Sequence, residues 1–187
     1  MMKKVLYLLA FALLLGESVK SQDFIIPEKY QFKEASDYAP YKPLIKKSVD
    51  WLISSPVHDK PTYRQQVGAF VFKWIEGVPD THITIRGEFV GNLIADDAYK
   101  HTNALFLNYI AGLIQFALNN PESKDSVEAQ INALNAMLLG YESIRDSAPN
   151  SYLDKLLKVQ KKGKMRSWIE QNWRQPKTPS IKNQKLI

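Results

Sequence analysis

The chain has 187 residues, of which 45% are hydrophobic and 11% aromatic, and this composition argues against an intrinsically disordered protein. It has no cysteine, which excludes disulfide bonds and a lipid-bearing N-terminal cysteine, so stability must come from a hydrophobic core. The formal net charge of +6 is unevenly distributed, because residues 22–154 carry 12 Lys and Arg against 17 Asp and Glu, and residues 155–187 carry 10 against one. Only the C-terminal part therefore supports an argument for an anionic partner.

Residues 1–21 have the pattern of a secretory signal peptide. Two lysines precede an uninterrupted apolar run over residues 5–15, and a segment of small and polar residues follows. The run is too short for a transmembrane helix, which needs about 20 apolar residues. We therefore expect cleavage before Gln22. The product would be a secreted or periplasmic protein that is not a lipoprotein and has no transmembrane segment after removal of the signal peptide.

The mature chain is expected to form a single all-α domain over residues 43–175. An extended aromatic arm precedes it at residues 22–42, and a basic, mobile tail follows at residues 176–187. Apolar residues at helical spacing predict about six helices, arranged as a helical bundle or as stacked α-hairpins.

Proline and glycine residues mark the first helix boundaries. The first helix is expected to begin at Pro43, and the second to run from about Pro61 to Glu76. Gly77 is expected to adopt the left-handed conformation that closes a helix.

Residues 81–86 form the one segment with a strand-like pattern. Ile83 and Ile85 alternate with polar residues, which predicts a short extended segment whose isoleucines face the core. Residues 87–97 are ambiguous, although their apolar residues have helical spacing. Residues 104–118 are apolar on every side, so we expect a buried central helix there rather than a membrane span.

The next helix is expected to start at Pro121. Asn120 is predicted to cap this helix, and Pro121 is suited to its first position. Polar residues of this helix, including Gln130, are expected on its outer side. Gly140 here and Gly112 in the central helix would allow the two backbones to approach closely, although nothing in the sequence pairs them.

Two further helices are expected near the C-terminus. Ser151 and Asp154 have the spacing of a capping box at the start of one of them. A last short helix is expected over residues 164–173.

Three stretches of the chain are similar to uncharacterised exported helical proteins of Gram-negative bacteria. They are "FVFKWIEGVPDTHITI", "NALFLNYIAGLIQFAL" and the lysine-rich "LLKVQKKGKMRSWIEQ". The resemblance implies an α-helical fold and export, and it implies no catalytic residues.

Two groups of residues are candidates for chemistry, although no nucleophile elbow, P-loop, dinucleotide fingerprint, zinc-protease helix or calcium loop is present. Asp80 and His82 lie where the chain leaves a helix, which suggests either a ligand-contacting loop or a structural joint, and the joint is favoured. Asp97 and His101 would share one face if their segment were helical, and they would then be placed for metal binding or general base catalysis. The alternative is a surface pair near a helix start.

The basic C-terminal segment is the most discriminating feature. Trp168 and Trp173 lie near one face of the last predicted helix, and Lys162, Lys164 and Arg166 surround it. Such an element can contact an anionic envelope component or an acidic protein. In the alternative interpretation, the tryptophans pack inward and the lysines only keep the surface soluble.

These patterns predict an exported, soluble, non-catalytic binding or accessory module of the cell envelope, without a cofactor and without a nucleic-acid partner. The alternative is a metal-dependent or hydrolytic enzyme with its site near Asp97 and His101.

Overall fold

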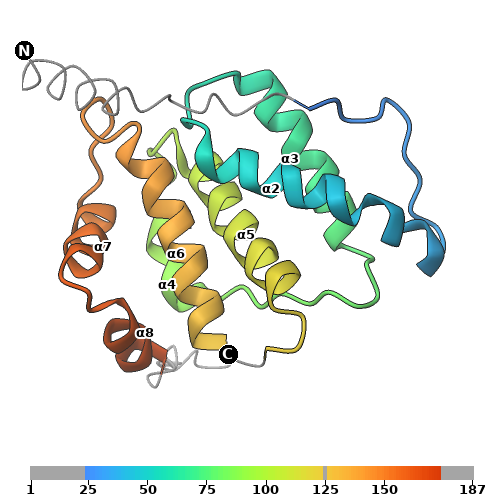
Figure 1. Ribbon diagram of the computed structural model, residues 1–187. Coiled ribbons are helices and arrows are strands. Elements are labelled where there is room, and N and C mark those ends of the chain that lie inside the picture. The colour runs from blue at the N-terminus through green and yellow to red at the C-terminus, as the bar shows by residue number, and fades with distance from the viewer. Residues whose placement is uncertain (1–23, 124–125, 174–187) are drawn as a thin grey trace, which may run out of the picture.

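The computed structural model describes residues 24–123 and 126–173, which fold as helices and loops with no β-strand among them (Figure 1). The predicted signal peptide at residues 1–21 and the predicted tail at residues 176–187 lie outside these ranges. The elements are two 3-10 helices, η1 (Ala35–Asp37) and η2 (Ala39–Tyr41), followed by α2 (Lys42–Ser54), α3 (Pro61–Ile75), α4 (Gly87–Ile94), α5 (Thr102–Asn119), α6 (Ser126–Glu142), α7 (Ser151–Lys161) and α8 (Met165–Trp173).

The helices pack as a bundle around α5, which confirms the predicted all-α class. α5 packs most extensively against α6 and then against α2, while α7 and α8 pack on α6 and α4 packs against α5, α7 and α8 (Figure 1). Every residue of α5 from 107 to 114 is buried, as expected for a helix that is apolar on all sides. No helix in the described part of the chain combines the length and the apolar character that a membrane span requires.

Glycine allows α5 and α6 to pack in close contact. A Cβ atom on Gly112 of α5 would lie 2.7 Å from the Cα of Ala133 and 2.9 Å from the Cβ of Ala136, both in α6. Gly140 of α6 instead leaves room for the side chain of Asn108 of α5, whose amide nitrogen a Cβ atom there would overlap. The predicted close approach of the two backbones is therefore present at Gly112, and the two glycines do not face one another.

Glycine is needed at position 77 because of a lack of space and not, as predicted, because of a left-handed backbone conformation. It does not have the positive φ of a left-handed helix end. A Cβ atom there would instead overlap the hydroxyl group of Tyr38, whose backbone carbonyl accepts a hydrogen bond from the Trp74 indole at 3.1 Å. The aromatic arm therefore requires a residue without a side chain at the end of α3.

The aromatic arm covers α3 with its rings. Tyr30, Phe32 and Tyr41 all contact the ring of Phe70, with centroid distances of 4.9, 6.2 and 6.0 Å. The arm is not extended throughout, because η1 and η2 fold its last part into 3-10 turns.

Two predicted helix starts are displaced in the structure. The helix expected at Pro121 begins at Ser126, because the Asn120 side chain closes the end of α5 by donating to the Phe116 carbonyl at 3.0 Å. The cap of α7 is Asn150 rather than Ser151, and its side-chain oxygen accepts from the N–H groups of Tyr152 and Leu153 at 3.0 and 3.1 Å. Asn150 and Ser151 are both suited to the cap, and the hydrogen bonds between Asn150 and Tyr141 decide between them.

A buried arginine joins three helices, α2, α3 and α5. Arg64 of α3 is only 4% exposed, and among the described residues no carboxylate forms an ion pair with it. Burial lowers its pKa to about 10, so the guanidinium group is still charged at neutral pH. Its two terminal nitrogens donate to four acceptors, which are the carbonyl oxygens of Leu52, Ser55 and Pro56 and the side-chain oxygen of Asn108.

Residues 81–86 are bound to the bundle through a buried glutamine. Gln130 of α6 is 1% exposed, so the prediction that it lies on the outer side is wrong. Its amide donates to the Thr84 carbonyl at 2.8 Å and its oxygen accepts from the Tyr109 hydroxyl. A segment without a strand partner needs such side-chain bonds for its backbone. The segment has no regular structure, and Ile83 packs against the core while Ile85 is 47% exposed, so only one isoleucine faces inward as predicted.

This contact predicts a specific loss of stability in alkali. Burial raises the pKa of Tyr109 to about 12 from an ordinary value of 10. The phenol therefore stays protonated in the folded state, and its contribution to stability is complete below pH 10 and is lost as the pH rises through 12. The stability of the wild type relative to Tyr109→Phe should fall across this window, by up to about 3 kcal/mol.

Urea unfolding of both proteins at mildly alkaline pH and at successively higher pH measures this difference. Other tyrosines with a raised pKa that do not interact with Tyr109, such as Tyr99, contribute equally to both proteins and cancel. A parallel loss of stability in the two proteins would contradict the assigned role of Tyr109.

Candidate functional site

The loop that contains Asp80 and His82 borders a hollow of about 270 Å³. The hollow lies between this loop, the end of α5 and the start of α6. The ammonium group of Lys42 donates to the Asp80 carboxylate at 2.6 Å, and this hydrogen bond is the main reason that the pKa of Asp80 is lowered. His82 is exposed. Since the Asp80 carboxylate fastens the loop to α2, the contacts favour a structural joint over a catalytic loop.

Asp97 and His101 do not share a helical face. Both lie in the loop between α4, which ends at Ile94, and α5, which begins at Thr102. The helical spacing of four residues that was assumed for this pair therefore does not apply. The ring of His101 instead contacts the ring of Tyr99, with centroids 5.9 Å apart.

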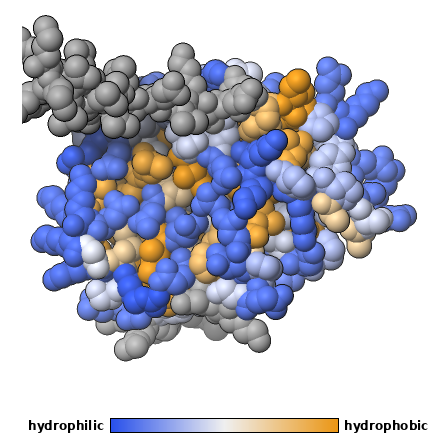
Figure 2. Space-filling view, viewed as in Figure 1, coloured by the Kyte–Doolittle hydropathy of each residue, from blue (hydrophilic) through white to orange (hydrophobic). Residues whose placement is uncertain are grey.

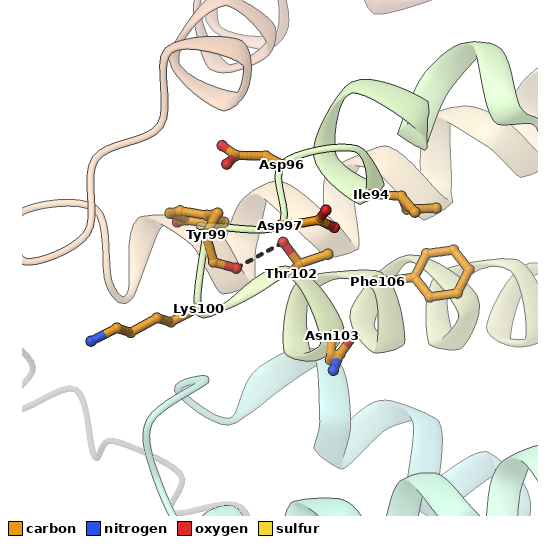
Figure 3. Close-up of a pocket in the computed structure, with 8 residues that line it drawn as sticks. All are labelled: Ile94, Asp96, Asp97, Tyr99, Lys100, Thr102, Asn103 and Phe106. Carbon is orange, nitrogen blue, oxygen red and sulfur yellow. Dashed lines mark hydrogen bonds between the residues drawn. The ribbon is translucent and has the colours of Figure 1, made fainter.

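A second hollow, of about 500 Å³, opens at this loop, and Asp97 lines it while His101 does not. Figure 3 shows that the polar side chains around it diverge: the carboxylate of Asp96, the ammonium of Lys100 and the amide of Asn103 point in different directions. The hydroxyl of Thr102 is engaged with the backbone carbonyl of Tyr99 at 2.9 Å. Among the described residues, no three His, Asp or Glu side chains are placed to hold a metal ion. The polar groups therefore lack the convergence that a metal or acid–base site requires.

The same loop is anchored to the turn between α6 and α7. The Tyr99 hydroxyl donates to the Ala148 carbonyl at 2.9 Å, and burial raises the pKa of this phenol to about 12. The carboxylate of Asp96 accepts from the side-chain amide of Asn150 at 3.4 Å. These groups have structural partners, which accounts for their position without a ligand.

The tryptophans of α8 pack inward. The ring centroid of Trp168 lies 5.7 Å from that of Phe89 in α4, and the ring of Trp173 lies 6.0 Å from Phe89. The Arg86 guanidinium covers Trp173 at 4.2 Å from the ring centroid. Ile169, on the same side of α8, is fully buried. Of the two arrangements considered for Trp168 and Trp173, the structure has the one in which the apolar stripe faces the bundle.

The cations around this stripe separate into two groups. Arg166 forms ion pairs with Glu128 of α6 and, at 3.8 Å, with Glu170 of its own helix. Lys161 pairs with Glu142 at 3.3 Å. Four other lysines are exposed and form no ion pair with a carboxylate in the described part of the chain, and we call them the lysine face: Lys155, Lys158, Lys162 and Lys164.

The lysine face follows from the sequence of α7 and of the turn after it. Lys155, Lys158 and Lys162 are spaced by three and four residues, so they share one side of the helix axis. The opposite side, which includes Leu153, Leu156 and Leu157, is buried against the bundle. α7 and α8 form one edge of the molecule, and Figure 2 shows hydrophilic side chains along that edge.

A glycine turn adds the fourth lysine. Gly163 has a φ of +66°, a conformation that other residues rarely adopt, and it reverses the chain between α7 and α8. Lys164 follows directly and its side chain is exposed.

A scan of protein-family models found no match to this chain, and neither did searches of curated proteins and of solved structures. Function must therefore be inferred from the side chains and their placement. Of the candidate residues, Lys162 and Lys164 belong to the lysine face, whereas Arg166 is paired and Trp168 and Trp173 are packed. Lys155 and Lys158 were not among the candidates, although their spacing opposite the leucines is visible in the sequence.

Proposed function

We propose that this chain is an exported, non-catalytic binding module of the cell envelope that contacts an anionic partner through the lysine face. The observation that carries the proposal is the lack of ion pairs in the described part of the chain: Lys161 and Arg166 pair with carboxylates, and the four lysines between and beside them do not. Of these four, Lys158 acts on the Asp154 carboxylate, but only through space and without an ion pair. Export rests on the signal-peptide pattern of residues 1–21.

The lysine face is expected to contribute little to the stability of the fold, because the favourable position of Lys158 in the last turn of α7, near Asp154, is opposed by the neighbouring lysines. Like charges three and four residues apart on a helix destabilise it by about 0.2–0.5 kcal/mol per pair. The lysines cover no part of the core, because the leucines of α7 are buried on the other side. Their charge is therefore available to an external partner, and they belong to the most basic part of the sequence, residues 155–187.

The proposal predicts that removal of these four charges weakens binding to a polyanion more than removal of four charges elsewhere. The two variants to compare are a lysine-face variant, carrying Lys155→Gln, Lys158→Gln, Lys162→Gln and Lys164→Gln, and a control variant, carrying Lys29→Gln, Lys33→Gln, Lys46→Gln and Lys47→Gln. All eight lysines are exposed, and both variants change the net charge equally.

Retention of residues 22–187 on immobilised dextran sulfate measures the effect. The lysine-face variant should elute at clearly lower salt than the control variant, while both keep the thermal stability of the wild type, because exposed lysines contribute little to it. Equal elution of the two variants would show that only net charge matters, and the proposed function would then be abandoned.

A further inference from the structure

We infer that the anionic partner is the surface of a lipid bilayer, to which the protein adsorbs through the lysine face without inserting a side chain into the acyl region. This inference rests on the proposed function and names the partner for the same surface. It follows from three features of α7 and α8: their apolar side chains are not exposed, they lie outside the hollows described above, and their unpaired cations are of one type.

The first feature is that α7 and α8 expose no large apolar side chain. Among the described residues, the exposed large hydrophobic side chains lie in other elements, namely Ile25, Phe72, Ile85, Ile94 and Leu139. A specific protein–protein interface needs an apolar core, usually with aromatic side chains, inside a polar rim. The lysine face supplies a rim without a core, which disfavours an acidic protein as the partner.

The absence of exposed rings on α8 also determines how the protein meets a membrane. Helices that insert into the interface present Trp, Phe or Leu to the lipid. Trp168 and Trp173 are instead packed against Phe89 of α4. Adsorption must therefore be electrostatic, with the lysine ammonium groups at the level of the head groups.

The second feature is the position of this edge outside the hollows. Neither of the two hollows described above includes a residue of α7 or α8. Proteins that follow a linear polyanion such as single-stranded nucleic acid do so in a basic groove with aromatic platforms. The lysine face belongs to neither hollow, and four exposed ammonium groups can meet a plane of charge, so this face fits a bilayer surface better than a chain.

The third feature is the type of cation: along α7, α8 and the turn between them, the described cations that form no ion pair with a carboxylate are all lysines, whereas Arg166 is paired. Arginine forms bidentate hydrogen bonds of fixed geometry, whereas lysine is a hydrated point charge on a flexible stem. Flexible point charges suit a fluid surface, on which the positions of the anionic head groups are not fixed. The following residues 174–187 add four cations and no acid to the same end of the sequence.

The expected size of the effect follows from the number of lysines. Each lysine close to an anionic bilayer contributes binding that corresponds to a partition coefficient about fivefold higher. Replacing all four should thus reduce partitioning onto anionic vesicles at least about 100-fold, and raising the NaCl concentration severalfold should have a similar effect because the charges are exposed.

Sedimentation with vesicles of phosphatidylglycerol and phosphatidylcholine tests the inference, with phosphatidylcholine alone as the neutral surface. The wild type and the control variant should bind the anionic vesicles, and the lysine-face variant should not. Tryptophan fluorescence should be unquenched by lipids with brominated acyl chains, because no tryptophan enters the acyl region.

Each alternative outcome has a distinct meaning. If dextran sulfate binding depends on the lysine face but anionic vesicles are not bound, the partner is a soluble polyanion, so the lipid inference fails and the proposed function stands. If neither surface distinguishes the two variants, both fail. Quenching by brominated lipids in the bound wild type would overturn adsorption without insertion.

Discussion

Gly112→Ala is expected to lower the free energy of unfolding by about 2 kcal/mol, whereas Gly91→Ala is expected to raise it by about 0.5 kcal/mol. The added Cβ atom at position 112 would meet the Cα of Ala133 at 2.7 Å and the backbone oxygen of Asn132 at 3.0 Å. Backbone atoms cannot rotate away as the end of a side chain does, so α5 and α6 would have to move apart and lose packing along their interface.

Gly91 is a matched control for the intrinsic helix preference of alanine. It lies inside α4, and a Cβ atom there would have no neighbour within 4 Å. Alanine therefore gains helix propensity at this position without a steric cost. Urea and thermal unfolding measure both changes, and Gly112→Ala should shift the Tm downward by about 4–8 °C. If Gly112→Ala raised the stability as Gly91→Ala does, the interface would tolerate the extra atom.

The fold could be predicted where one segment contains all the information that determines its structure. Residues 104–118 are apolar on every side, and such a helix can only be satisfied in the centre of a bundle, where α5 is found. The leucines of α7 likewise specify its buried side. Helix ends were less predictable because they depend on side-chain bonds. Asn150 and Ser151 are both good caps, and Asn150 is fixed by the hydrogen bond from its N–H group to the Tyr141 hydroxyl at 2.9 Å.

Buried polar residues could not be placed from periodicity alone. Gln130 is buried because the Thr84 carbonyl, distant in sequence, needs a donor. Arg64 shares a helical stripe with Val67, Gly68 and Val71, and this spacing was the one available signal that its side chain would be buried. Its acceptors come from other elements, so the sequence of α3 could not identify them.

Among the candidate-site residues too, local sequence patterns could be read in advance, whereas contacts between distant segments could not. Lys162 and Lys164 could be proposed from the sequence because they lie beside the apolar face of the last predicted helix. Lys155 and Lys158 lie opposite the leucines of α7, and this local pattern could have identified them as well. The direction of Trp168 and Trp173 depends on Phe89, and Phe89 belongs to a segment whose helical state was ambiguous. A membrane-facing and a core-facing tryptophan have the same spacing in the sequence, so only the position of α4 separates them.

Arg64→Met is expected to destabilise the fold by about 3 kcal/mol, since it removes every donor from a group of buried acceptors. The Arg64 guanidinium donates to Ser55 and Leu52 carbonyls at 2.6 and 3.0 Å, near the C-terminal end of α2, where the helix dipole favours a cation. Its other acceptor in the core is the Asn108 oxygen at 3.0 Å, and the Asn108 amide continues the network to the Ala136 carbonyl at 3.3 Å.

Removing a buried charge also has a favourable side, and the expected value includes it. Burial lowers the pKa of Arg64 to about 10, which shows that the protein disfavours the charged form relative to water. Methionine relieves this desolvation, but it leaves buried carbonyls without donors, each of which costs about 1–3 kcal/mol. The lost hydrogen bonds are therefore expected to outweigh the relief.

Two further variants separate hydrogen-bond geometry from charge. Arg64→Lys keeps the cation but offers one nitrogen where the guanidinium offers two, so it should also destabilise the fold, by about 2 kcal/mol. Lys73→Met removes an exposed cation from the same helix, where its ion pair with Glu76 at 3.6 Å is worth less than about 1 kcal/mol. Urea unfolding at neutral pH should show the largest loss for Arg64→Met, a smaller one for Arg64→Lys and almost none for Lys73→Met. If Arg64→Met were as stable as Lys73→Met, the acceptors would not need the guanidinium, and Arg64 would not be what joins α2 and α3 to the centre of the bundle.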